Sequence, residues 1–380
     1  MSNKLNNPIW VMSSAYDKLP LDQLIEVSKN VGAQGIDLCV FRKDGTRTDH
    51  TATHLDYENF STEDAKILLD KFNTAQLGLS LGAFENMIGG EEKERVANQN
   101  HLLRLIRIAH LLGGDRNDVK VGTFVGYNHD LGNQIDGFEK NLEEYQRVFT
   151  PIVKYAEDLG VTIVYENCPM EGWRSARYTS TYNNLPGVLA ARKLMYAMIP
   201  SPAHGEIYDP SHDIWQNNNP VDVISQMDMN RLKRIHVKTT RNLKTKARVE
   251  WGGMYPMQHV SEALASRAGV DIPEHDWDRH HYEAMLPGFG GTDHMDWNDF
   301  VSILQERGFN GPFEIENEAK NSKDTGNVHA TNQGFAHCIG FLAPLLWDID
   351  CNQGYVYPKS QGNLQVPSVS DIPEITIDRL

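Results

Sequence analysis

The chain is poor in cysteine, and this limits the kinds of site that it can build. It has only four cysteines, Cys39, Cys168, Cys338 and Cys351, and no two of them are spaced as CxxC. Scattered thiols of this kind are typical of reduced proteins and argue against a disulfide framework or a cysteine-bound zinc cluster. A metal site in this chain must therefore use histidine and carboxylate ligands.

Long apolar runs and an excess of positive charge are also missing. No stretch approaches the ~18 apolar residues of a membrane span, and the opening MSNKLNNPIW lacks the apolar core of a secretory signal. We therefore expect a cytoplasmic protein without a membrane partner. The 36 basic residues against 51 acidic residues give a net charge of −15, which repels polyanions. Nucleic acid is not an expected partner.

A G-x-G-x-x-G motif is absent after the first predicted strand, which argues against a dinucleotide-binding open sheet. Apolar strand-like stretches instead alternate with helical patterns, as in an α/β protein with a (β/α)8 TIM barrel. The predicted strands cover 8–15, 35–41, 77–84, 119–125, 161–167, 204–209, 234–239 and 312–317. The predicted helices cover 21–31, 61–72, 91–112, 142–156, 185–199, 221–232, 297–304 and 335–346. In such a barrel the active site lies at the carboxyl ends of the strands.

Two segments interrupt this alternation. We assign residues 1–350 to one barrel domain, in which 240–295 forms a long loop after strand seven that is rich in Trp, Met and His. A loop at this place is expected to cover the barrel mouth. Residues 351–380 form a C-terminal extension that either wraps its own surface or contacts a partner chain. We also expect a homo-oligomer, either a dimer or a tetramer.

The last four predicted strands end on side chains that can bind a metal or transfer a proton. Glu166 ends VTIVYE, Asp209 ends GEIYD, His236 lies in RIHVKT and Glu316 lies in PFEIEN. Any one of these alone is more often a salt bridge, a cap or a buried polar group. Because the carboxyl ends of barrel strands meet at one face, together they predict a single site for Mn²⁺, Mg²⁺, Co²⁺ or Zn²⁺.

Further polar side chains share these strand ends. His212 follows Asp209 across a Pro-Ser turn, so both can face one cavity. Lys238 is two residues after His236 and therefore shares its face of the strand. The last strand carries three acids on one face, Glu314, Glu316 and Glu318. Because all three lie on the same face, the alternation of side chains along the strand does not show which of them is the ligand.

The motifs YENCPM, YDPSHDIWQ, HVKT and LPGFGG…DW…GFNGPFEIENE occur in this order. They resemble the sugar phosphate isomerase/epimerase superfamily of xylose isomerase-like barrels, which includes ketose 3-epimerases, inosose dehydratases and, more distantly, the endonuclease IV group. The resemblance covers residues 8–346. It implies one divalent metal ion, with Mn²⁺ as the first choice, and a set of four ligands, Glu166, Asp209, His236 and Glu316.

The resemblance also implies how the site works. A metal-stabilised enediolate would form next to the carbonyl of a ketose, while Glu166 and Glu316 remove and return a proton from opposite sides. His212 is similar to the family's substrate-contacting histidine and would, with Lys238, hold or polarise the carbonyl oxygen. Glu314 stands where relatives usually have a neutral residue. It could compete with Glu316 or pair with Lys238.

The first functional hypothesis is thus a metal-dependent isomerase or epimerase of a sugar or sugar derivative. A lyase or dehydratase acting on a keto-sugar, keto-inositol or keto-glycoside would use the same metal and base. The sequence has no obvious phosphate-binding glycine loop, which favours a free, oxidised or glycosidic sugar over a sugar phosphate. An endonuclease IV-like phosphodiesterase is a weaker alternative, because it would need several more His ligands on earlier strand ends. His50, His54, His101 and His110 do not fall in such motifs, and helical His101 and His110 are predicted to be structural. A non-catalytic binding protein would not require four converging ligands.

Overall fold

Eight parallel strands close into a barrel in the computed structural model of the protein. The structure describes residues 4, 6–46, 51–170, 183–216, 218–242, 261–270, 282–289, 295–319, 327–350, 354–355 and 363–380. The barrel strands are β1 Ile9–Met12, β2 Gly35–Cys39, β3 Gly78–Gly82, β4 Val121–Thr123, β5 Ile163–Glu166, β6 His204–Tyr208, β7 Leu232–Val237 and β10 Phe313–Ile315. Strand β10 pairs with both β1 and β7, which closes the ring. The predicted (β/α)8 barrel is therefore confirmed.

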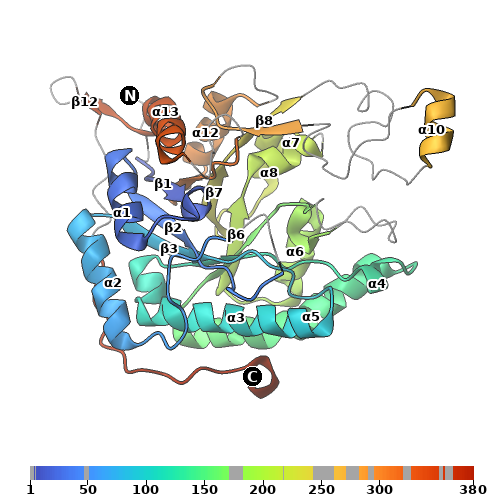
Figure 1. The fold of residues 1–380 in the computed structure, drawn as a ribbon, viewed down its shortest axis with the longest axis horizontal. Helices are drawn as coiled ribbons and strands as arrows, with labels where there is room; N and C mark the ends of the chain where they lie inside the picture. Colours follow the sequence, from blue (N-terminus) through green and yellow to red (C-terminus); the bar gives the residue numbers. More distant parts are fainter. Residues whose placement is uncertain are drawn as a thin grey trace.

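Helices surround the barrel on its outer side (Figure 1). The main ones are α1 Leu21–Asn30, α2 Thr62–Ala75, α3 Glu92–Leu111, α5 Gly137–Leu159, α6 Leu189–Met198, α8 Pro220–Gln226, α12 Trp297–Glu306 and α13 Val328–Leu346. Each predicted helix is present, but the one predicted over 221–232 is wrong at its end. The chain is extended at Met227, with a ψ of 151°, and Leu232 already belongs to β7. The prediction ran too far because apolar residues in the turn and at the start of β7 happen to continue the spacing that is typical of a helix.

Local sequence sets several helix ends. Ser61 and Asp64 form a capping box at the start of α2, in which the Ser61 side chain accepts from the Asp64 amide and the Asp64 side chain accepts from the Ser61 amide. Gly160 ends α5 in the left-handed conformation with a φ of 64°, which glycine adopts without a steric penalty. The first of these fixes where α2 begins, and the second turns the chain back toward the sheet after α5.

Side chains along each strand point alternately outward and inward, so the buried residues form two separate regions. Residues such as Leu79, Ile235 and Phe313 point outward and pack beneath the helices in the main hydrophobic core. A second apolar cluster, which includes Phe84 and Ile207, fills part of the barrel interior. The interior side of β7 and β10 is ionic instead.

The long segment after strand seven begins and ends in a two-stranded ladder. Strand β8 Thr239–Asn242 starts one residue after Lys238 and pairs antiparallel with β9 Tyr282–Met285. Between them, helix α10 Glu262–Ala268 is described. The ladder rises at the carboxyl end of β7. Much of 240–295 lies outside the described residues, so its covering of the mouth stays a prediction.

Residues 363–380 of the C-terminal extension lie against α2 and α3. The Asn73 side chain donates to the Leu364 carbonyl at 2.9 Å and accepts from the Leu364 amide at 2.7 Å. Further along, Arg104 contacts both carboxylate oxygens of Glu374 at 3.0 and 3.1 Å. Figure 1 shows this tail in dark red below α2 and α3. Residues 363–380 thus wrap their own barrel, while a partner chain at the extension stays a prediction.

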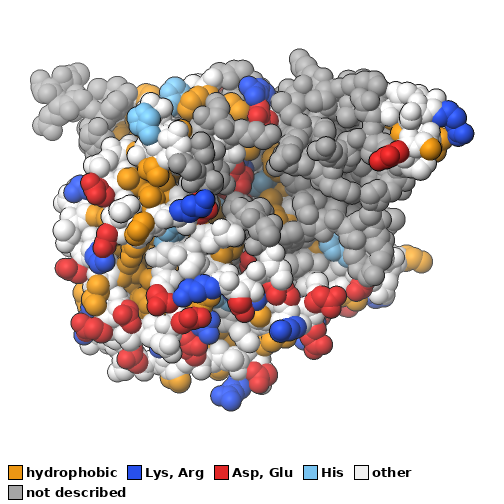
Figure 2. Space-filling view, in the orientation of Figure 1, with side chains coloured by type: hydrophobic (Ala, Val, Ile, Leu, Met, Phe, Trp, Pro, Cys, Tyr) orange, Lys and Arg blue, Asp and Glu red, His pale blue; other side chains and the backbone are white. Residues whose placement is uncertain are grey.

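Charge is mixed on the visible surface. In Figure 2, acidic and basic side chains are interspersed over the lower part of the face, around α3 and α5. No basic groove is visible among the described residues of this view. Within the described ranges, every helix is too short or too polar to cross a bilayer.

Candidate metal centre

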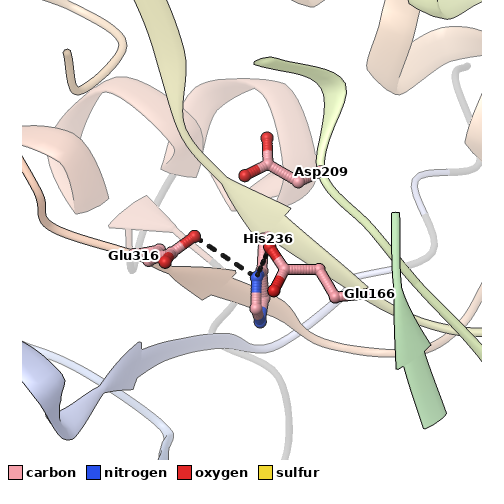
Figure 3. Close-up of side chains that lie close together, drawn as sticks. All are labelled: Glu166, Asp209, His236 and Glu316. Carbon is pink, nitrogen blue, oxygen red and sulfur yellow. Dashed lines mark hydrogen bonds and ion pairs between the residues drawn. The ribbon is translucent and has the colours of Figure 1, made fainter. Parts of the chain in front are cut away.

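Four potential metal ligands meet at the carboxyl ends of four neighbouring strands, β5, β6, β7 and β10. They are Glu166, Asp209, His236 and Glu316, and their ligand atoms all lie within 4.8 Å of one another. All four side chains are buried, with at most 5% of any of these residues exposed. Figure 3 shows Glu166 and Glu316 on either side of the His236 ring, with Asp209 above it. The structure therefore brings together the four residues that were predicted as ligands.

The His236 ring is central to this group. Its Nδ1 atom lies 3.2 Å from Glu166 Oε1 and 3.4 Å from Glu316 Oε2. His236 sits opposite Glu314 in the β7–β10 register, so Glu316 is two residues nearer the mouth. Nδ1, and not Nε2, is thus the nitrogen that faces the carboxylates of Glu166 and Glu316.

Asp209 is held by its own helix and by the neighbouring strand end. It caps the short helix α7 Pro210–Trp215, where its Oδ1 accepts from the Ser211 amide at 2.8 Å. The Asn167 side chain accepts from the Asp209 amide at 2.8 Å and donates to the Asp209 carbonyl at 3.0 Å. Oδ2 has ion-pair neighbours but no hydrogen bond among the described residues. One carboxylate oxygen therefore starts a helix, while the other faces the site.

Both residues predicted to contact substrate lie inside the same group. Lys238 Nζ is 2.7 Å from Glu316 Oε2 and 3.1 Å from Asp209 Oδ2. His212 Nε2 is 3.2 Å from Glu166 Oε1 and 3.2 Å from Asp209 Oδ2. Each proposed base thus has a nitrogen donor beside it, His212 for Glu166 and Lys238 for Glu316.

Opposite charges favour ionisation of Glu166 and Glu316 despite their burial, whereas burial raises the pKa of Asp209. Burial opposes ionisation of Glu166, but His236 and His212 outweigh it and hold the pKa of Glu166 well below its usual value. Burial also opposes ionisation of Glu316, and Lys238 is the main group that lowers its pKa. The pKa of His236 is raised well above its usual value, because Glu166 and Glu316 outweigh the effect of burial. Without a metal ion, the site is thus balanced by its own cations.

This donor set fits a divalent cation. Glu166, Asp209 and Glu316 supply three carboxylates, and His236 supplies one imidazole nitrogen. Oxygen ligands with one nitrogen ligand suit Mn²⁺, Mg²⁺, Co²⁺ and Zn²⁺. A metal ion held by four protein ligands can still have coordination positions open for substrate oxygens.

The family model of the xylose isomerase-like TIM barrel matches residues 25–339 of this chain. The chain belongs to this family. A search of curated proteins finds no match to the sequence.

Several solved structures share the fold of this xylose isomerase-like barrel. An L-ribulose 3-epimerase has a TM-score of 0.54 and 14% identity, over 90% of this chain and 94% of that chain. The probable 3-DHS dehydratase AsbF from Bacillus anthracis has a TM-score of 0.57 and 12% identity, over 88% and 98%. The IOLI protein with a bound zinc atom has a TM-score of 0.57 and 15% identity, over 89% and 98%. Epimerases and a probable dehydratase are thus built on this fold, as the sequence resemblance predicted.

Within this xylose isomerase-like barrel, Glu314 lies deeper in the interior than the four-residue group, two residues before Glu316. Its Oε1 is 3.1 Å from Arg234 Nε, and its Oε2 is 3.7 Å from His236 Nε2. The prediction that Glu314 could pair with Lys238 is wrong, because Lys238 is one layer higher and contacts Glu316 and Glu318 instead. Burial raises the pKa of Glu314 to about 8, with Asp37 adding to the shift.

An aromatic ring that sequence analysis missed forms another wall of the centre. Phe84 lies with its ring centroid 6.1 Å from that of His236 and 5.2 Å from that of Phe124. Its place depends on two glycines that point inward, since an added Cβ would meet the Phe84 ring at 2.8 Å from Gly82 and at 3.0 Å from Gly122. Inward glycines on strands three and four were the signal available in the sequence.

The other histidines considered from the sequence hold backbone groups. His54 ring nitrogens lie 3.1 Å from the carbonyls of Leu19 and Ser13, and His101 Nε2 lies 2.6 Å from a carbonyl on the β2 side. His110 Nδ1 lies 2.7 Å from the Leu159 carbonyl. The structural role predicted for His101 and His110 is confirmed, whereas His50 lies outside the described residues. Within the described part of the chain, these histidines add nothing to the four-residue group.

Proposed function

We propose that this chain is a divalent-metal-dependent isomerase or epimerase that moves a proton next to the carbonyl of a sugar or sugar derivative. The observation that carries the proposal is the placement of two buried carboxylates, Glu166 and Glu316, on either side of the His236 ring (Figure 3). Inversion at one carbon requires an acid–base group on each side of the substrate, because one removes a proton and the other returns it. The arrangement supports such a reaction.

The cation would be held by Glu166, Asp209, His236 and Glu316, with Mn²⁺ proposed first and Mg²⁺, Co²⁺ or Zn²⁺ as alternatives. When bound, such an ion stabilises negative charge that develops on the carbonyl oxygen of a substrate. Asp209 is the ligand least suited to proton transfer, because Oδ1 is already engaged in the helix cap.

The proposed bases are supported by the nitrogen groups beside them. Glu166 is kept ionised mainly by His236 and His212, and Glu316 mainly by Lys238, so each can accept a proton from carbon. His212 and Lys238 are proposed to donate hydrogen bonds to substrate oxygens. Lys238 directly follows β7, and His212 lies on α7 after β6, so both are at the carboxyl ends of the strands. Substrates bind at this end of such barrels.

The test replaces each proposed base by its amide in metal-loaded protein. With free ketohexoses and their oxidised derivatives as probes, interconversion by Glu166→Gln or Glu316→Gln should fall by roughly 100-fold or more. In D2O, each single variant should still exchange the acidic hydrogen on one face without changing the configuration. Glu206→Gln is the matched control, because this buried β6 carboxylate points outward to Arg192 at 3.4 Å. It should retain turnover.

The same measurement separates a lyase or dehydratase from an epimerase. A one-base lyase would lose both exchange and elimination in Glu166→Gln, whereas Glu316→Gln would mainly weaken metal binding. If both variants keep full turnover with metal bound, the proposal is wrong for either reaction.

A further inference from the structure

A column of charged side chains runs inside the barrel below the metal centre. Arg234 and His236 project inward from β7, and Glu314 projects inward from β10 between them. At the lower end, Arg234 Nη2 lies 3.0 Å from Asp118 Oδ2 and donates to the Asp118 carbonyl at 2.7 Å. Each of Arg234, His236 and Glu314 is at most 2% exposed. Buried ionisable groups are costly unless they are paired or hydrogen-bonded, so the partners of these three side chains matter.

The two nitrogens of His236 face different partners. Nδ1 faces the carboxylates of Glu166 and Glu316 at 3.2 and 3.4 Å. Nε2 points the other way, toward Glu314 Oε2 at 3.7 Å, and has no hydrogen bond among the described residues. A neutral histidine that binds a metal through Nδ1 carries its proton on Nε2. That proton would be directed at the Glu314 carboxyl group.

We propose that Glu314 is a positioning residue that holds His236 with Nδ1 toward the metal centre, and that Arg234 in turn holds Glu314. This inference rests on the metal centre of the proposed function. A carboxyl group behind a ligating histidine fixes the tautomer and the ring orientation, and its loss typically weakens metal binding by about 10- to 100-fold. Arg234 keeps Glu314 in place because its Nε lies 3.1 Å from Oε1.

A second cation is the competing explanation for the same residues. Ligand atoms of Asp37, His236 and Glu314 also lie within 4.8 Å of one another. The guanidinium of Arg234, however, already places a positive charge beside Glu314. A metal ion there would be repelled by that fixed cation. The two explanations predict different metal stoichiometry.

The chain offers a closely matched control. Glu206 and Arg192 form another buried Glu–Arg pair, 3.4 Å apart, with side chains at most 3% exposed. Their strand and helix place them outside the barrel interior, between β6 and α6. Glu206→Leu therefore removes the glutamate partner of a buried arginine, as Glu314→Leu does, without touching His236. Any general loss of stability should be similar in the two variants.

The experiment titrates Co²⁺ into metal-free wild type, Glu314→Leu, Glu314→Gln and Glu206→Leu, recording affinity and the visible absorption spectrum. We expect one Co²⁺ per wild-type chain and little change in Glu206→Leu. Glu314→Leu should bind about 10- to 100-fold more weakly, with an altered spectrum. Glu314→Gln should be intermediate, because its single amide oxygen can accept from only one of Arg234 and His236.

Several outcomes would overturn the positioning role. One is a Glu314→Leu variant that binds Co²⁺ like Glu206→Leu, with the wild-type spectrum. If Glu314→Leu does not fold, a Glu314→Gln affinity equal to wild type has the same meaning. Two Co²⁺ ions per wild-type chain, one of them lost in the variants, would replace positioning by a second cation site. Wild type that binds no Co²⁺, Mn²⁺ or Mg²⁺ would defeat the proposed metal centre itself, which is a separate result.

Discussion

Acidification from pH 7 to pH 5 is expected to destabilise the fold through His101, a buried histidine on α3 away from the metal centre. Its Nε2 lies 2.6 Å from the Val40 carbonyl, and its ring packs edge-on against Tyr57 with centroids 4.7 Å apart. Burial lowers the pKa of His101 from its ordinary 6.5 to about 4. A proton on this ring must therefore enter an environment that does not solvate it.

The size of the effect follows from the two pKa values. Between pH 6.5 and pH 4 the unfolded chain binds the proton and the folded chain does not, so a lower pH favours unfolding. The contribution of His101 to stability is complete above about pH 7 and is lost as the pH falls toward 4. Between pH 7 and pH 5 the loss is about 2 kcal/mol.

His101→Gln isolates this contribution, because glutamine keeps an N–H for the Val40 carbonyl but does not titrate. Urea unfolding of wild type and variant, followed by circular dichroism with a chelator present, gives the free energy of unfolding at both pH values. The variant should lose about 2 kcal/mol less than wild type between pH 7 and pH 5. The lost ring contact with Tyr57 adds an offset that is the same at both pH values. Equal losses in the two proteins would refute the reasoning.

Two further predictions concern the metal and the tail. Protein purified with Mn²⁺ available should contain one divalent ion per chain by metal analysis, and chelation should abolish activity until Mn²⁺, Co²⁺ or Mg²⁺ is added; neither binding nor an effect on activity would contradict the site. Leu364→Ala should cost ~2–4 kcal/mol in urea unfolding, because Leu364 is 7% exposed in the tail contact. Val366→Ala is the control, since Val366 is 52% exposed and should change stability by less than ~0.5 kcal/mol. Equal effects would show that the tail does not pack as described.

The sequence by itself determined the order of strands and helices and therefore the barrel. Apolar stretches such as 35–41 and 77–84 are short and bounded by polar turns, and they alternate with amphipathic segments, a pattern that few folds satisfy. Glu166, Asp209 and His236 could then be identified from the motifs and from the fact that barrel active sites lie at the carboxyl ends of the strands. A place at a strand end tells both which face of the barrel a side chain is on and how far along the barrel axis it lies. A role for them in binding metal is still a proposal.

For the acids on and after β10, the family resemblance pointed to Glu316, but only the tertiary structure gave the physical reason that separates it from its neighbours. Glu314, Glu316 and Glu318 share one face of the chain, so their parity is identical. What separates them is depth along the barrel axis, which depends on how β10 is staggered against β7. The register sets Glu314 opposite His236 and leaves Glu316 one layer higher, beside Lys238.

The same reason explains the residues that sequence analysis did not find. Arg234, Phe84 and Asn167 act through partners on other strands, and no local pattern encodes which strand lies across the barrel interior. Phe84 reaches the site only because Gly82 and Gly122 leave room for its ring. Asn167 matters because its side chain bonds both backbone groups of Asp209, 42 residues later. Contacts of this kind are set by closure of the ring of strands, and closure is a property of the whole chain.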